Sequence, residues 1–229
     1  MLRTLLFWIN LMIATPVLAT IACLFFFLER VFLGCAHLWG RWVLAAAGVR
    51  VTREERAPLP PGPAIYMFNH ASNFDIFAIA TNLPPRARFI AKKQLGWIPI
   101  FGWALHLCGM ILIDRENHRK AMVQIQAVAR KIQSGRPVLM APEGTRSRDG
   151  GLLPFKKGGF VMAILAGVPV VPVVIHGAYD IQPRGSFRIN PGTVRVVFME
   201  PVSTKELTVD DRTALLEKVR GIFLAELGA

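Results

Sequence analysis

Strand-length apolar runs alternate with helical segments from residue 64 onward, and this alternation limits the chain to a small set of folds. Such alternation is typical of an α/β sheet. We therefore predict an α/β fold with a mixed, largely parallel central sheet flanked by helices. The predicted strands are 64–68, 87–91, 110–113, 138–141, 168–175 and 193–198, and the predicted helices are 75–82, 99–107, 117–133, 158–166 and 205–227.

Residues 50–63 separate this domain from a different N-terminal region. The segment mixes charged residues with four prolines and Gly62, which indicates a boundary or an edge strand leading into the core. Residues 50–229 number 180, enough for one domain with a sizeable core. We predict an N-terminal helical region at 1–49 and a separate domain at 50–229.

The N-terminal region is strongly apolar. No charged residue occurs from 5 to 28, and a helix of that length would reach about 36 Å, enough to cross the hydrocarbon layer. A second apolar run at 31–49 is interrupted by Arg41 and three glycines, which favours an interfacial or packed helix. Either a single span or shallow hairpin, or a pair of helices lying partly in one leaflet, fits this pattern.

A cleaved signal peptide is a further interpretation of the same region. Arg3 precedes the apolar stretch, and Val17-Leu18-Ala19 fits a cleavage site. The apolar run continues beyond that point through 21–28, which favours a retained anchor. Three cysteines at 23, 35 and 108 form no disulfide framework or metal spacing, and they agree with a reducing compartment.

The charge balance favours anionic partners. The chain has 27 basic and 15 acidic residues, a formal charge of +12, yet 53% of its residues are hydrophobic. Residues 86–157 hold 14 Lys and Arg against 4 acids. Such a segment suits an anionic bilayer or phosphate-bearing substrates, although it also fits a solvated basic face. Nucleic acid fits poorly because no nucleic-acid-binding motif accompanies the basic residues.

A histidine and a carboxylate lie five residues apart where the first predicted strand ends. Residues 69–75 read NHASNFD, and they occupy the turn before a short apolar helix. If His70 lies in the turn and Asp75 in the first helical turn, the carboxylate can accept the Nδ1 proton and raise the basicity of the imidazole. His70 would then act as a general base, whereas the alternative is an ordinary helix-capping turn.

Further polar clusters follow two other predicted strands, and together they resemble a known family. The blocks are NHASNFD at 69–75, GMILIDR at 109–115, PEGTRS at 142–147 and VPVVPV at 168–173. Their order and spacing resemble those of the 1-acylglycerol-3-phosphate (lysophosphatidate) acyltransferases of the glycerolipid acyltransferase superfamily. The resemblance covers most of residues 60–180. It also implies that the N-terminal helical pair anchors the catalytic domain on the bilayer.

The resemblance implies a role for each matching residue. His70 and Asp75 correspond to the catalytic pair, and Arg115, Glu143, Gly144, Thr145 and Arg146 correspond to residues linked to the glycerol phosphate of the acceptor. Lys92 lies in a segment similar to the family's Lys-x-x-Leu and is a further candidate. Phosphate binding suits arginine and lysine side chains. Surface salt bridges for the arginines, and a capping role for Glu143, are the alternatives.

The expected reaction moves a fatty acyl group from acyl-CoA or acyl carrier protein to the free hydroxyl of lysophosphatidate, giving phosphatidate. A thioester is already activated, so a base-assisted hydroxyl can attack it without an acyl-enzyme. We expect no cofactor, no metal site and a location at the inner or cytoplasmic membrane facing the cytoplasm. Another lysolipid acceptor such as lyso-ornithine lipid, a thioesterase, and a non-catalytic lipid-binding protein of the same fold are alternatives.

Overall fold

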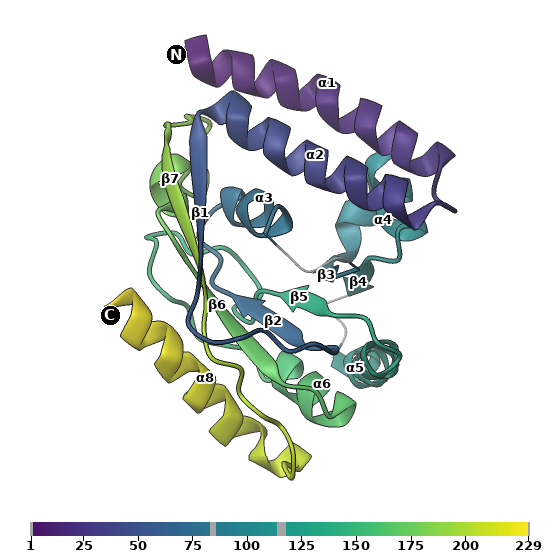
Figure 1. Ribbon diagram of the computed structural model, residues 1–229, viewed down its shortest axis with the longest axis vertical. Helices are drawn as coiled ribbons and strands as arrows, with labels where there is room; N and C mark the ends of the chain where they lie inside the picture. Colours follow the sequence, from purple (N-terminus) through teal and green to yellow (C-terminus); the bar gives the residue numbers. More distant parts are fainter. Residues whose placement is uncertain (1, 83–85, 114–117, 229) are drawn as a thin grey trace.

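The computed structural model describes residues 2–82, 86–113 and 118–228, without the side chains of residue 29 and residues 118–122. Its centre is a seven-stranded sheet in the order β1-β7-β6-β2-β5-β3-β4 (Figure 1). Strands β2 to β6 run parallel to one another, and β7 is antiparallel to β6 and parallel to β1. The predicted mixed, largely parallel sheet is confirmed. The strands are β1 Val49–Glu55, β2 Ile65–Phe68, β3 Arg88–Lys92, β4 Ile111–Ile113, β5 Val138–Met140, β6 Val170–His176 and β7 Gly192–Phe198.

Helices cover both faces of the sheet. The N-terminal helices and α3 lie on one face, and α5, α6 and α8 lie on the other (Figure 1). The helices are α1 Leu2–Leu24, α2 Glu29–Ala47, α3 Phe74–Ala80, α4 Phe101–Leu107, α5 His118–Gln133, α6 Gly158–Ala166, α7 Ala178–Ile181 and α8 Arg212–Leu227, with short 3₁₀ helices η1 Lys93–Trp97 and η2 Val209–Asp211.

The central strand β2 shows why the sequence forms a covered sheet. Tyr66 and Phe68 pack toward the N-terminal helices, whereas Ile65 and Met67 pack toward α5, α6 and α8. Successive side chains of a strand point to opposite faces, and all four are buried here. A continuous apolar run is therefore required, because neither face meets water.

Two boundary regions refine the predictions. Residues 50–63 include most of β1, which pairs only with β7 at the edge of the sheet, so the edge-strand interpretation is confirmed. The prediction that the last helix begins at 205 is wrong, since α8 begins at Arg212. The carboxylate of Asp211 accepts hydrogen bonds from the backbone and hydroxyl of Thr208 at 2.7 and 2.8 Å, and this capping box forms η2 ahead of α8.

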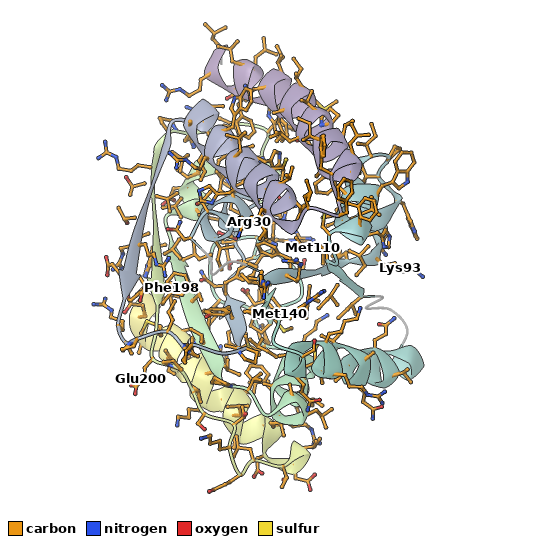
Figure 2. All side chains as sticks on the ribbon, turned by 45° about the vertical axis from the view of Figure 1, so that its right-hand side comes forward. Arg30, Lys93, Met110, Met140, Phe198 and Glu200 are labelled. Carbon is orange, nitrogen blue, oxygen red and sulfur yellow. The ribbon has the colours of Figure 1, made fainter. Side chains whose placement is uncertain are left out.

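The N-terminal helices α1 and α2 lie side by side across the top of the domain in Figure 1. Helix α1 is long and apolar enough to span a membrane by length and composition, and only 28% of its most apolar window is buried. Its outer side and the following turn present almost only carbon atoms (Figure 2). Phe7 on its inner side is 2% exposed and contacts Phe74, the residue before Asp75.

Candidate active site

The site lies where the parallel strands end. The turn 69–73 follows β2, and residues 141–157 follow β5, the neighbouring parallel strand. The carboxyl ends of parallel strands meet at one edge of a sheet, which is where α/β proteins form ligand sites. The two polar turns consequently lie in contact, and the hydrogen-bonded pair His70 and Glu143 is 73 residues apart in sequence.

His70 and Asp75 form a direct pair in this edge. The distance from His70 Nδ1 to Asp75 Oδ2 is 2.9 Å, and the same carboxylate oxygen accepts the backbone N–H groups of Ala71 and Ser72 at 2.8 Å each. The Asp75 side chain is 1% exposed and that of His70 is 19% exposed. The carboxylate therefore holds the ring through Nδ1, which leaves Nε2 as the nitrogen able to accept a proton.

Helix α3 supplies the geometry of the pair. It begins at Phe74, so Asp75 lies in its first turn, where the partial positive charge of the helix N-terminus favours a carboxylate. The two backbone N–H groups that bind its oxygen belong to the turn just before the helix. The five-residue spacing thus lets one carboxylate hold both the turn and the imidazole.

Both backbone groups of His70 are bonded to the second polar turn. Its N–H donates to Glu143 Oε1 at 2.6 Å, and its carbonyl accepts the N–H of Ser147 at 2.8 Å. The other carboxylate oxygen of Glu143 accepts the N–H of Leu153 at 2.9 Å. Glu143 is 3% exposed, and burial raises its pKa from 4.5 to about 7. Its carboxylate positions the His70 turn, and its implied contact with substrate stays a prediction.

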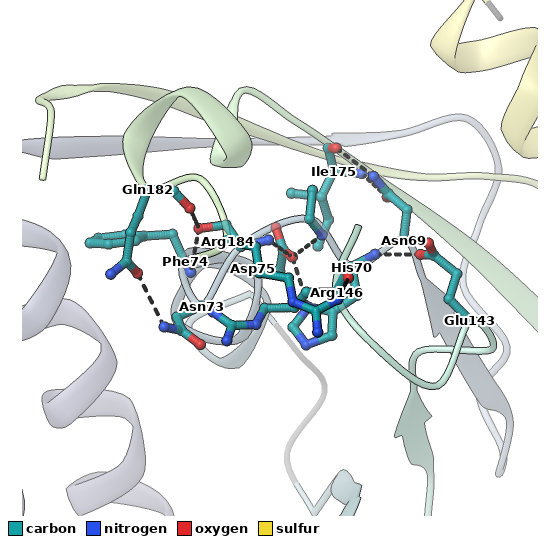
Figure 3. Close-up of polar contacts among 12 residues, drawn as sticks. Asn69, His70, Asn73, Phe74, Asp75, Glu143, Arg146, Ile175, Gln182 and Arg184 are labelled. Atoms are coloured by element: carbon teal, nitrogen blue, oxygen red, sulfur yellow. Dashed lines mark hydrogen bonds and ion pairs between the residues drawn. The ribbon is translucent and has the colours of Figure 1, made fainter. Parts of the chain in front are cut away.

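Asn69 holds the other side of the turn. Its side-chain Nδ2 donates a hydrogen bond to the Ile175 carbonyl at 2.9 Å, and its Oδ1 accepts one from the Ile175 N–H at 2.7 Å (Figure 3). These two bonds tie the end of β2 to the end of β6. The residue is 7% exposed, so these two bonds satisfy polar groups that water cannot reach.

A cavity of about 440 Å³ opens beside His70 and extends beneath the N-terminal helices. Its apolar walls come from α1, α2, α3, β3 and α4, and they include Ala22, Phe32 and Phe101. Met110, labelled in Figure 2, lies in the same wall. The volume falls within the roughly 300–1,000 Å³ typical of small-molecule sites. An apolar cavity with an imidazole at its polar end suits a fatty acyl chain whose carboxyl end reacts.

Cationic side chains line the same cavity as His70. Lys92 at the end of β3 lines the cavity together with Gly144, Thr145 and Arg146. Gly144 has a φ of +76°, a conformation that L side chains rarely adopt. Lys92, Gly144, Thr145 and Arg146 thus line the cavity that His70 also lines, whereas Arg115 lies outside the described residues.

Two residues of this site were not identified from the sequence. Gln182 lies just after α7. Its backbone carbonyl accepts a hydrogen bond from the Ser72 hydroxyl at 2.8 Å, and its Oε1 accepts one from the Asn73 side-chain amide at 3.1 Å. Arg184 follows it and lines the cavity. Neither residue lies in a block that resembles the family, and only the path of the β6–β7 connection brings them to the dyad.

The thiol of Cys108 is poorly suited to covalent catalysis. It is buried, and burial raises its pKa to about 12, so the reactive thiolate is strongly disfavoured. Among the described residues, no group of three or more His, Cys, Asp or Glu side chains could hold a metal ion. In the part of the chain that the structure covers, the His70–Asp75 pair is therefore the best-formed catalytic arrangement.

Comparison with known proteins places this geometry in a family. The model of the Acyltransferase family matches residues 48–176, which include the dyad and the second polar turn. This chain belongs to the acyltransferase family. The predicted resemblance is confirmed.

The relatives of this chain include proteins from bacteria and plants. A 1-acyl-sn-glycerol-3-phosphate acyltransferase of Salmonella typhimurium is 38% identical over 196 residues, which cover 83% of this chain and 79% of that protein. The enzyme of the same name from Limnanthes douglasii is 35% identical over 72% of this chain, which spans 59% of the plant protein.

A solved structure supports the same conclusion for the fold. The crystal structure of the 1-acyl-sn-glycerophosphate acyltransferase PlsC from Thermotoga maritima matches with a TM-score of 0.83 and 26% identity, covering 98% of this chain and 94% of that one. The match includes the N-terminal helices as well as the sheet, because it extends over nearly the whole chain.

Proposed function

We propose that this chain transfers a fatty acyl group from acyl-CoA or acyl carrier protein to the free hydroxyl of 1-acylglycerol-3-phosphate, giving phosphatidate. The observation that supports this most directly is the His70–Asp75 pair at an apolar cavity that Lys92 and Arg146 also line. The relatives named above act, by their names, on the same acceptor.

The reaction needs one base and no covalent enzyme intermediate. His70 Nε2 takes the proton of the acceptor hydroxyl as its oxygen attacks the thioester carbonyl carbon. Asp75 stabilises the imidazolium that forms. The tetrahedral intermediate then collapses, the carbon–sulfur bond breaks, and the imidazolium returns the proton to the departing thiolate. The acyl chain lies in the apolar cavity throughout.

Lys92 and Arg146 bind the acceptor phosphate in this proposal. A guanidinium can make two parallel hydrogen bonds to phosphate oxygens, and a lysine contributes a point charge. Both line the same cavity as His70, so a glycerol backbone held at its phosphate can present its hydroxyl to the base. Arg115 is assigned to the same phosphate by family resemblance alone.

The chain acts at a membrane surface in this proposal, with residues 1–49 as the anchor and 50–229 as the catalytic domain. Large apolar side chains are exposed along α1, at 25–28 and at Trp97, Ile98 and Trp103. An exposed apolar surface of this kind fits the bilayer that dissolves both the acceptor and the product. The expected membrane is the inner or cytoplasmic one, with the domain on the cytoplasmic side, where acyl donors are made.

Transfer by the purified protein in liposomes tests the function. Acyl-CoA and acyl carrier protein are compared as donors, and the acceptors are lysophosphatidate, lysophosphatidylcholine and a lyso-ornithine lipid. The proposal expects acylation of lysophosphatidate in clear preference to the other two. Preferred acylation of an acceptor without a phosphomonoester would overturn the assigned roles of Lys92 and Arg146, and no transfer to any acceptor would favour a lipid-binding protein.

A further inference from the structure

The connection between β6 and β7 is built into the catalytic edge. Gln182 is 4% exposed, and it bonds to both Ser72 and Asn73 of the dyad turn (Figure 3). Its side-chain amide also donates to the Ser186 carbonyl at 3.0 Å. The segment that includes Arg184 is thereby fixed on both sides of that residue. These buried and partly buried hydrogen bonds fix the position of the segment relative to the His70 turn.

Arg184 lies beside Arg146 at the polar end of the cavity (Figure 3). Its Nη1 donates to the Arg146 carbonyl at 2.7 Å, which uses one of the five N–H donors of the guanidinium. Both residues line the same cavity as His70 and Lys92. The bond orients the planar group while most of its donors stay available.

The two arginines are close without a carboxylate between them. In the described ranges of the chain, no acidic side chain lies within ion-pair distance of either guanidinium. Burial lowers the pKa of Arg146, the neighbouring charge of Arg184 lowers it further, and the Asp75 carboxylate partly offsets both effects. Like charges held together by buried structure lower the affinity for other cations and favour a multiply charged anion.

We propose that Arg184 binds the phosphate monoester of the acceptor together with Arg146 and Lys92. This inference rests on the proposed function and adds a residue outside the recognised sequence blocks. A phosphate monoester carries up to two negative charges and three terminal oxygens, which suits several cations converging from different elements. Lys92 comes from the end of β3, Arg146 from the turn after β5 and Arg184 from the β6–β7 connection.

The contact with the Arg146 carbonyl allows a second role, in which Arg184 only positions the second polar turn. A positioning role would change kcat, because Arg146 and the backbone bonded to His70 would shift. A binding role would change the KM for the acceptor. Donor phosphates are a third possibility, and they would appear in the KM for acyl-CoA.

The kinetic test compares Arg184→Ala and Arg184→Lys with Arg188→Ala, a matched control. Arg188 is an exposed arginine four residues further along, outside the cavity lining. Arg184→Ala removes charge-assisted hydrogen bonds to the acceptor phosphate. The loss should raise the KM for lysophosphatidate about ten- to hundredfold. We expect kcat to change less than about threefold, the KM for the donor to stay constant, and Arg184→Lys to recover part of the loss.

Binding of glycerol 3-phosphate, measured by calorimetry on the full chain, gives a readout independent of turnover. Arg184→Ala should weaken this binding about tenfold or more, and Arg188→Ala should leave it unchanged. A fall in kcat at constant KM, a raised KM for the donor alone, or unaltered glycerol 3-phosphate binding would each overturn the assignment. Failure of the wild-type protein to make phosphatidate would instead overturn the proposed function, while the binding comparison would still decide the role of Arg184.

Discussion

Replacing Asp75 by asparagine removes one charge from the catalytic pair while keeping its shape. The amide oxygen can take the place of Oδ2, which accepts hydrogen bonds from His70, Ala71 and Ser72. The amide NH₂ then occupies the place of Oδ1, which is buried and has no hydrogen-bond partner among the described residues. We therefore expect Asp75→Asn to fold and to bind substrate with a nearly unchanged KM.

The Asp75→Asn substitution should lower kcat. Asp75 stabilises the imidazolium across 2.9 Å, in a site where the carboxylate side chain is 1% exposed. With charge centres about 4 Å apart and an effective dielectric constant of about 20, the interaction is about 4 kcal/mol. Each 1.36 kcal/mol is a factor of ten in rate, and the proton is only partly transferred in the transition state, so kcat should fall about 10²- to 10³-fold.

The assay is steady-state phosphatidate formation in liposomes, with far-ultraviolet circular dichroism to confirm folding. Asp180→Asn is the matched control, because it removes one carboxylate from an exposed position on α7. It should leave kcat within about twofold of the wild type. A folded Asp75→Asn variant with kcat within tenfold of the wild type would refute the assignment of Asp75 as the group that stabilises the imidazolium.

Three further predictions follow from buried groups of the site. Because the pKa of Glu143 is about 7 in the folded chain and 4.5 ordinarily, the native state holds this proton more tightly and its stability falls as pH rises from about 4.5 to 7. This fall in the free energy of unfolding amounts to at most about 3 kcal/mol. A plot of Tm against pH should therefore be flatter for Glu143→Gln than for the wild type over that range, and equal slopes would contradict the assignment. Asn69→Ala leaves the Ile175 N–H and carbonyl unpaired and should lower the free energy of unfolding in urea by about 1–3 kcal/mol; a loss below about 0.5 kcal/mol would be inconsistent with this. Cys108→Ser should retain kcat within about threefold in the liposome assay, since the thiol is buried with a pKa of about 12; loss of turnover in a folded variant would reopen an acyl-cysteine route.

The sequence predicts the fold well because the central strands β2, β5 and β6 have no exposed face. A strand such as β2 must be apolar throughout when helices cover both sides, and short apolar runs separated by helices leave few other architectures. The misplaced start of α8 has a local cause. Residues 205–211 have helix-compatible composition, but Asp211 bonds to Thr208 and fixes a separate turn.

The dyad is readable from sequence because its two members lie one turn apart. The residues that hold the dyad turn in place cannot be predicted in this way. Glu143 and Gln182 reach the His70 turn only through the sheet order and the β6–β7 connection. Glu143 also illustrates how resemblance and geometry differ. The block suggests a residue that faces the acceptor, whereas the structure shows its carboxylate bonded to the backbone of His70 and Leu153.

Segment 97–103 shows a similar limit. From the sequence alone, its apolar residues are equally compatible with core, with an acyl tunnel or with a bilayer surface. Phe101 lines the cavity, while Trp97 and Trp103 are 70% and 61% exposed. Hydrophobicity alone could not divide these residues between two environments, because both favour the same side chains.

The central claim is acyl transfer to lysophosphatidate with His70 as the base, and phosphatidate formation by wild type and His70→Ala in the same liposomes tests it most directly. Base catalysis by a positioned histidine contributes about 10²- to 10⁴-fold, so the wild type should form phosphatidate and the folded variant should lose at least about a hundredfold in kcat. A variant that retains activity within tenfold, or a wild type that makes no phosphatidate from either donor, would contradict the account.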